Sequence, residues 1–171
     1  MVPCQAWMSI LDDGSVTLAM AVGGYPEPHR QNEHVGGNEV YGKTIEACVL
    51  ELMLLITNAA DALGTPGEHD LRLGIEWAGP QPLLITTFDR HGLRYEDNSV
   101  PLGRYTPLRT SIRSDIGGDD LQRQMHEVAL DAVNQGGVQN LQIIANPDVT
   151  QRPPRKPQQD SAYPCRRSGL W

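Results

Sequence analysis

The chain is poor in the residues on which small extracellular domains and zinc sites depend. It has three cysteines among 171 residues, and Cys4, Cys48 and Cys165 show no CxxC motif and no paired Cys/His spacing. This pattern argues against a disulfide framework and a structural zinc site, and it favours a reducing compartment, for which we predict the cytoplasm. Residues 1–9 also lack the basic and apolar regions of a signal peptide.

Long hydrophobic runs and aromatic residues are scarce as well. The most apolar stretch, residues 47–56, contains Glu51 and is too short to cross a bilayer, so we predict no membrane partner. Aromatic residues make up 5% of the chain with a single phenylalanine, so the core must consist of Leu, Ile, Val, Ala and Met. Lysine occurs twice among 14 basic residues, a bias typical of a GC-rich bacterial coding sequence.

The charge is unevenly distributed along the chain. Residues 1–146 hold 19 acidic and 9 basic side chains, a formal charge of −10, whereas residues 147–171 hold 2 acidic and 5 basic ones, a charge of +3. An acidic body lacks the basic face that nucleic acids require, so we expect no nucleic-acid partner. We predict two parts: an acidic domain over 1–146 and a basic, proline-rich flexible tail over 147–171.

Hydrophobic periodicity predicts a small α+β domain. Helical spacing bounded by glycines predicts two helices, over 43–63 and 119–135. Alternation with a period of two predicts six strands, over 7–11, 16–22, 71–77, 83–89, 108–113 and 138–144. Asp12-Asp13-Gly14 predicts a hairpin between the first two strands, and residues 78–81 predict another between the third and fourth. The resulting fold is a two-layer sandwich in the order β-β-α-β-β-β-α-β. Its sheet is mainly antiparallel, with both helices on one face and the last two strands parallel through the second helix.

A long polar loop, predicted over residues 23–42, ends in a phosphate-loop pattern. Gly37-Asn-Glu-Val-Tyr-Gly42-Lys43-Thr44 matches G-x-x-x-x-G-K-[ST], and over these eight residues it resembles P-loop NTPases. That resemblance implies backbone N–H groups around a phosphate, Lys43 on its outer oxygens and Thr44 on Mg²⁺. The nearest predicted strand ends at Val22 and belongs to a hairpin. Fourteen residues separate Val22 from Gly37, the first glycine of the pattern.

The same loop carries the only candidates for a metal-binding or proton-transferring histidine. His29 and His34 lie among glutamates, and Asp89 ends the predicted fourth strand, where it could act as a magnesium-site acid. The remaining histidines stand alone in the sequence, and no G-x-S-x-G nucleophile motif occurs. We therefore predict no catalytic residue, no resident metal and no cofactor, with a magnesium nucleotide only under the P-loop alternative.

Two surfaces are candidates for binding a protein. The strand faces that point away from the helices would carry small residues together with Arg72, Arg109 and Arg113, which suits an acidic partner, a phosphate or a second subunit on the open sheet face. The tail combines a spacer that favours the polyproline II conformation with an aromatic end. Its candidate docking residues are Arg152, Arg155, Lys156, Tyr163, Arg166, Arg167, Leu170 and Trp171.

These observations predict a non-enzymatic cytoplasmic binding or adaptor protein whose tail docks on a partner protein. Two alternatives stay open at this point. One is a phosphate- or nucleotide-handling enzyme that uses residues 37–44. The other is a folded leader domain that presents the C-terminal segment for modification by another enzyme.

Overall fold

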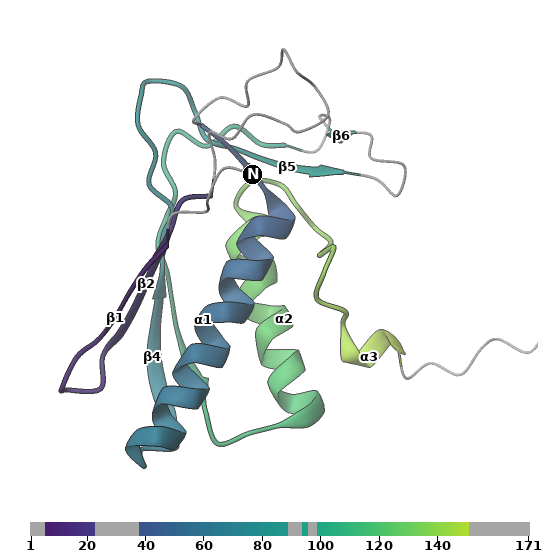
Figure 1. The fold of residues 1–171 in the computed structure, drawn as a ribbon. Coiled ribbons are helices and arrows are strands. Elements are labelled where there is room, and N and C mark those ends of the chain that lie inside the picture. The colour runs from purple at the N-terminus through teal and green to yellow at the C-terminus, as the bar shows by residue number, and fades with distance from the viewer. Residues whose placement is uncertain (1–5, 23–37, 89–93, 96–98, 151–171) are drawn as a thin grey trace, which may run out of the picture.

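The computed structural model describes residues 6–22, 38–88, 94–95 and 99–150. Helices α1 (Gly42–Leu63) and α2 (Gly118–Asn134) lie side by side, and a short helix, α3 (Pro147–Thr150), follows them. The strands within these ranges are β1 (Ala6–Ile10), β2 (Val16–Met20), β3 (Glu39–Tyr41), β4 (Glu68–Leu73), β5 (Leu84–Phe88), β6 (Arg94–Tyr95) and β7 (Leu108–Arg113). In Figure 1 the β1–β2 hairpin and β4 run beside the long helices, and β5 crosses above them.

The predicted class is confirmed: the fold is α+β, with two main helices and mainly antiparallel strands in small sheets. Helix α1 packs against β2, α2 packs against β7, and the two helices pack against each other. Among the residues described, no helix is both long enough and apolar enough to cross a membrane.

Both long helices form where apolar residues recur every three or four positions. The buried stripe of α1 consists of Ile45, Val49, Met53, Ile56 and Ala60, and that of α2 of Met125, Val128, Ala129, Ala132 and Val133. Helix α1 ends at Gly64, whose φ of 66° lies in the left-handed region that glycine adopts without strain. The sequence prediction is correct for both helices to within one residue at each end.

The first hairpin also forms as predicted. β1 pairs antiparallel with β2, with Ile10 opposite Val16, and Gly14 in the connecting turn has a φ of 83°. The Gly14 N–H donates to the Leu11 carbonyl, and the Leu11 N–H donates to the Ser15 carbonyl, both at 2.9 Å. Val16, Leu18 and Met20 are half-buried, as their alternation predicts.

The predicted second hairpin is wrong. β4 pairs antiparallel with β7 instead, and β5 pairs in parallel with β3, a three-residue strand inside the segment predicted as loop. Because Ile85 and Thr86 of β5 are fully buried, this strand needs a neighbour that brings apolar cover, and β3 supplies Val40, which is 2% exposed. Beyond β4, residues 74–77 keep the predicted alternation of burial without forming a ladder.

The last predicted strand, over residues 138–144, is also wrong. These residues form bends and irregular backbone with no strand pairing, and Ile144 is buried while Ile143 is 50% exposed. The backbone N–H groups of the last three, residues 142–144, bond to a buried side chain of α1, described below, so they are not free to join a sheet. The parallel pairing predicted for this segment is therefore wrong as well.

Candidate functional site

The exposed face of the β4–β7 pair brings two predicted binding residues together. In the register of this pair Arg72 lies directly opposite Arg109, Asp70 opposite Ser111, and Glu68 opposite Arg113. All six of these residues are exposed. Four of them, Asp70, Arg72, Arg109 and Ser111, line an open depression on this face together with Leu71 and Thr110.

Burial on the opposite side fixes which residues face outward. Leu71 and Ile112 are 4% and 2% exposed and belong to the core, so the residues that alternate with them must point to solvent. The predicted outward direction of Arg72, Arg109 and Arg113 is thus correct. A slip of one residue would bury these arginines, so the hydrophobic pattern fixes the register firmly.

The three arginines differ in their electrostatic surroundings. The guanidinium of Arg113 binds both carboxylate oxygens of Asp115, at 2.9 and 2.6 Å, and this contact raises the pKa of Arg113 and lowers that of Asp115. Within the described part of the chain, the guanidinium groups of Arg72 and Arg109 have no such contact with a carboxylate. Like charges directly opposite each other on a sheet destabilise it, so this end of the face favours an added anion.

A broad groove adjoins the arginine pair. It has a volume of about 1,040 Å³, and Arg72 lies on its rim, with Gly74, Trp77, Arg104 and Pro107 among its other lining residues. The Trp77 indole donates to the Gln81 carbonyl at 2.8 Å and so holds the turn that forms one wall. Arg104 is exposed and, like Arg72, contributes a guanidinium to the lining of the groove.

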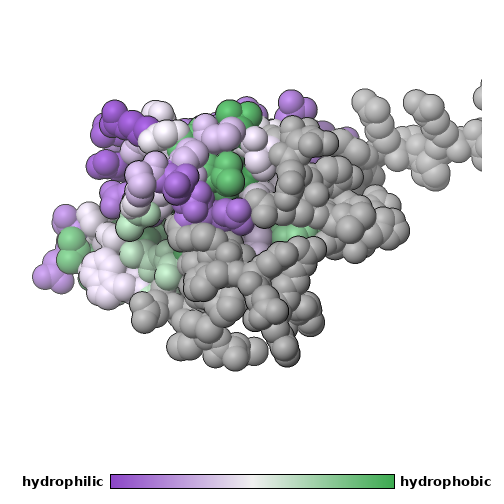
Figure 2. All heavy atoms as spheres, turned by 90° about the horizontal axis from the view of Figure 1, so that it is seen from above, coloured by the Kyte–Doolittle hydropathy of each residue, from purple (hydrophilic) through white to green (hydrophobic). Residues whose placement is uncertain are grey.

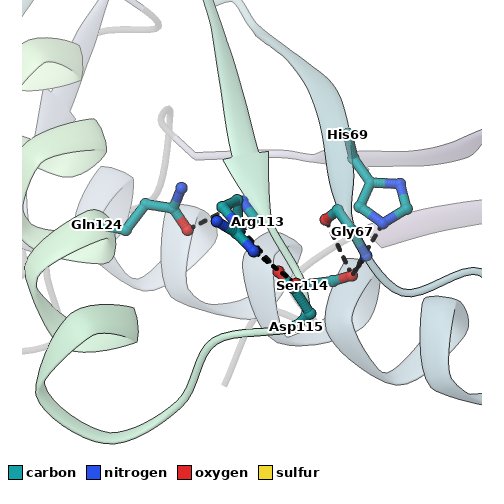
Figure 3. Close-up of polar contacts among 6 residues, drawn as sticks. All are labelled: Gly67, His69, Arg113, Ser114, Asp115 and Gln124. Atoms are coloured by element: carbon teal, nitrogen blue, oxygen red, sulfur yellow. Dashed lines mark hydrogen bonds and ion pairs between the residues drawn. The ribbon is translucent and has the colours of Figure 1, made fainter.

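A serine and a histidine meet at the other end of the same strand pair (Figure 3). Oγ of Ser114 lies 2.9 Å from Nε2 of His69, accepts the Gly67 N–H at 3.1 Å and lies 3.3 Å from the Gly67 carbonyl. The Ser114 backbone N–H also donates to that carbonyl, at 2.8 Å. Sequence reasoning placed His69 alone, because its partner lies 45 positions away and only the β4–β7 pairing brings the two together.

The Ser114–His69 contact joins two strands, and the pair lacks the features of a nucleophile and its base. Ser114 is 4% exposed, so a substrate carbonyl has no open approach to its hydroxyl. The nearby carboxylate, that of Asp115, is held by Arg113 and so does not orient His69 as the third member of a triad would. The contacts tie the start of β4 to the end of β7 and thereby support the exposed face.

The most buried charged group of the described chain is Glu46 on α1, which is 0% exposed. Its two carboxylate oxygens accept backbone N–H groups from three consecutive residues. The donors are Gln142 (2.8 and 3.0 Å), Ile143 (2.7 Å) and Ile144 (3.2 Å). Three convergent N–H groups form an anion-binding concavity, and here the protein's own carboxylate fills it. We assign Glu46 an anchoring role, since it fastens residues 142–144 to the first turns of α1.

The P-loop-like segment has a mixed setting. β3 runs directly into α1 through Gly42, and its partner β5 is parallel, so a strand does precede this helix, contrary to the sequence prediction. Residues 39–41, however, are extended and paired with β5, whereas a phosphate loop curls so that its N–H groups converge. The Lys43 ammonium lies 5.8 Å from the ring centres of Tyr41 and Phe88. Gly37 lies outside the described residues, and phosphate binding by Gly37, Gly42, Lys43 and Thr44 stays a prediction.

Several predicted site residues fall in parts of the chain that are not described. These are His29, His34, Asp89 and the tail residues Arg152, Arg155, Lys156, Tyr163, Arg166, Arg167, Leu170 and Trp171. Over the described ranges, no group of three or more His, Cys, Asp or Glu side chains could hold a metal ion. The predicted tail begins at Pro147, which is the first residue of α3, and Asp148 of this helix forms an ion pair of 3.3 Å with Arg123 of α2.

Comparisons of the chain with protein-family models, with curated proteins and with solved structures gave no match.

Proposed function

We propose that this protein is a non-enzymatic binding protein that holds an acidic segment of a partner protein on the exposed face of β4 and β7. The observation that carries the proposal is the direct opposition of Arg72 and Arg109, both exposed and without an acidic partner among the residues that the structure describes. Two guanidinium groups at this spacing present forked donors to one carboxylate or to two neighbouring ones. The scattered cysteines favour the cytoplasm as the place where this binding occurs.

The surrounding charge supports an acidic segment over a free-standing anion site. Asp70 and Glu68 make the face more negative toward its other end, where Arg113 is paired with Asp115. An extended partner in which acidic residues are followed by a basic one would match this gradient in charge, whereas a uniformly acidic ligand would not. The groove beside Arg72, with Trp77 and Arg104, offers space for the side chains that flank the acidic residue.

The test is a titration by fluorescence anisotropy with a labelled peptide that carries two adjacent glutamates followed by a lysine. We expect Arg72→Ala or Arg109→Ala to weaken binding by about tenfold to a hundredfold, because each removes a charge-assisted hydrogen bond of about 1.5–3 kcal/mol. Arg109→Glu should abolish binding, since it places a carboxylate in the site. Higher salt should weaken binding by the wild-type protein, because the arginines are exposed.

Arg123→Ala is the matched control, because Arg123 is already paired with Asp120 and Asp148 on the helical side. Equal affinities of the wild-type protein and the Arg72→Ala and Arg109→Ala variants would refute the proposal. So would a loss of affinity in Arg123→Ala as large as that in Arg72→Ala. Docking through the tail stays a separate prediction, to be tested by partner recovery with and without residues 151–171.

A further inference from the structure

Strand β1 exposes large apolar side chains on both of its faces. The exposed fractions are 58% for Trp7, 55% for Met8, 49% for Ile10 and 54% for Leu11. In Figure 2 the described surface shows hydrophobic and hydrophilic residues close together where the hairpin projects at the left. Single exposed apolar residues are ordinary, but four within one short strand and its turn form a patch of the kind that marks an interaction site.

The same strand has an open edge. Within the described part of the chain β1 pairs with β2 alone. The Leu11 N–H bonds to the Ser15 carbonyl, so residues 11 and 15 form a hydrogen-bonded pair, and such pairs alternate along an antiparallel ladder. The backbone N–H and C=O groups of Ala6, Met8 and Ile10 therefore point away from β2, toward the open edge.

We propose that β1 pairs antiparallel with β1 of a second copy of this chain, about a two-fold axis at Met8. In this register Met8 lies opposite its own copy, Ile10 opposite Ala6, and Trp7 opposite Ser9. Ile10 and Trp7 thus each face a small residue across the interface, Met8 meets its own copy at the axis, and the outward backbone groups of residues 6, 8 and 10 find partners. The strand carries no charge, and the acidic turns at Asp12 and Asp13 lie at opposite ends of the joined sheet.

The exposed area sets the expected strength of this dimer. Four large side chains that are each about half exposed offer at most on the order of 400 Å² per chain, the value reached if each had the roughly 150–250 Å² of an aromatic side chain. That is about half of the roughly 800 Å² per partner found in stable complexes. We therefore expect a weak dimer with a dissociation constant on the order of 100 µM.

The two-fold axis at Met8 gives the proposal a specific test by sedimentation velocity over a concentration series. Wild-type protein should form dimers as its concentration rises toward about 1 mM, on the affinity estimated above. Met8→Lys and Met8→Glu should each be monomeric, because like charges would face each other across the axis. An equimolar mixture of the two variants should form dimers again, with at least tenfold tighter association than either variant alone.

The same pair of substitutions at Leu11 is the control, since Leu11 does not face its own copy in this register and mixing should bring no rescue. Met8→Pro tests the backbone contribution: its lost N–H points away from β2, so the hairpin should persist while dimers are lost. Wild-type protein that stays monomeric over the whole series overturns the proposal. So does a Met8→Lys and Met8→Glu mixture that associates no better than its components. Peptide binding by Arg72 and Arg109 is measured separately and does not depend on either result.

Discussion

Replacing the buried carboxylate of Glu46 should destabilise the fold more than any other single truncation of a charged residue in the described chain. Glu46→Ala removes the acceptor of three consecutive N–H groups, which come from Gln142, Ile143 and Ile144. Each buried donor left without a partner costs about 1–3 kcal/mol, and part of this is offset because a buried charge is no longer desolvated. We expect a loss of about 3–5 kcal/mol, a large share of the roughly 5–15 kcal/mol that stabilises a typical domain.

Glu46→Gln separates charge from shape. The amide keeps one acceptor oxygen but turns its NH₂ group toward backbone donors, so we expect a loss of about 2–3 kcal/mol. Glu51→Ala is the matched control, because Glu51 lies on the same helix and is exposed. It should change stability by no more than about 0.5 kcal/mol.

Urea denaturation measures the free energy of unfolding, and hydrogen exchange followed by mass spectrometry locates the loss. We expect peptides covering residues 138–148 to lose protection in Glu46→Ala before those of α1 do, because the carboxylate fastens that segment. A change in stability equal to that of Glu51→Ala would refute the reasoning. Unchanged exchange at residues 142–144 would show that these N–H groups do not depend on Glu46.

Two further outcomes follow from the core. Gly136→Ala should cost about 1–3 kcal/mol in urea denaturation, because a Cβ there would lie 2.7 Å from the Cβ of buried Ile85, whereas Gly103→Ala, with nothing within 4 Å, should be close to neutral. Burial, with a smaller contribution from Asp131, raises the pKa of Tyr105 to about 12 from 10.0, so the fold favours the neutral hydroxyl. The stability that this hydroxyl contributes should be complete below pH 10 and lost as the pH rises through about 12. Stability curves of the wild-type protein and Tyr105→Phe should therefore converge over that range. Curves that stay parallel would contradict it.

The sequence was sufficient for elements whose signal is local. α1 and α2 were predicted because a repeat of three to four residues persists over many turns and glycine ends it, as Gly64 does. The first hairpin was predicted because Asp12-Asp13-Gly14 specifies its turn without any distant contact. The facing of Leu71 and Ile112 was correct for the same reason, since alternation within one strand decides it.

The errors arose where a distant partner decides the structure. β3 has one fully buried residue, Val40, which is too short a pattern to predict a strand unless β5 is known to lie beside it. Residues 138–144 were predicted as a strand, yet a carboxylate nearly a hundred positions earlier accepts the N–H groups of residues 142–144. Likewise, the sequence could place Arg72 and Arg109 on an outer face. It could not show that they face each other, because that depends on the β4–β7 register.

The two features that support binding share a physical character: each is unfavourable in the isolated chain. An arginine placed opposite another arginine costs up to about 1 kcal/mol relative to a neutral pair. An uncharged edge strand with exposed Trp7 and Met8 invites pairing, which most proteins prevent with charges, prolines or cover. Elsewhere in the described chain the same requirements are met: no buried side-chain polar atom lacks a partner, and even the buried Glu46 is fully hydrogen-bonded. Departures from good packing and pairing on an outer surface are expected where that surface meets something else. This contrast favours a binding role for β1 and for the β4–β7 face over a role in the core alone.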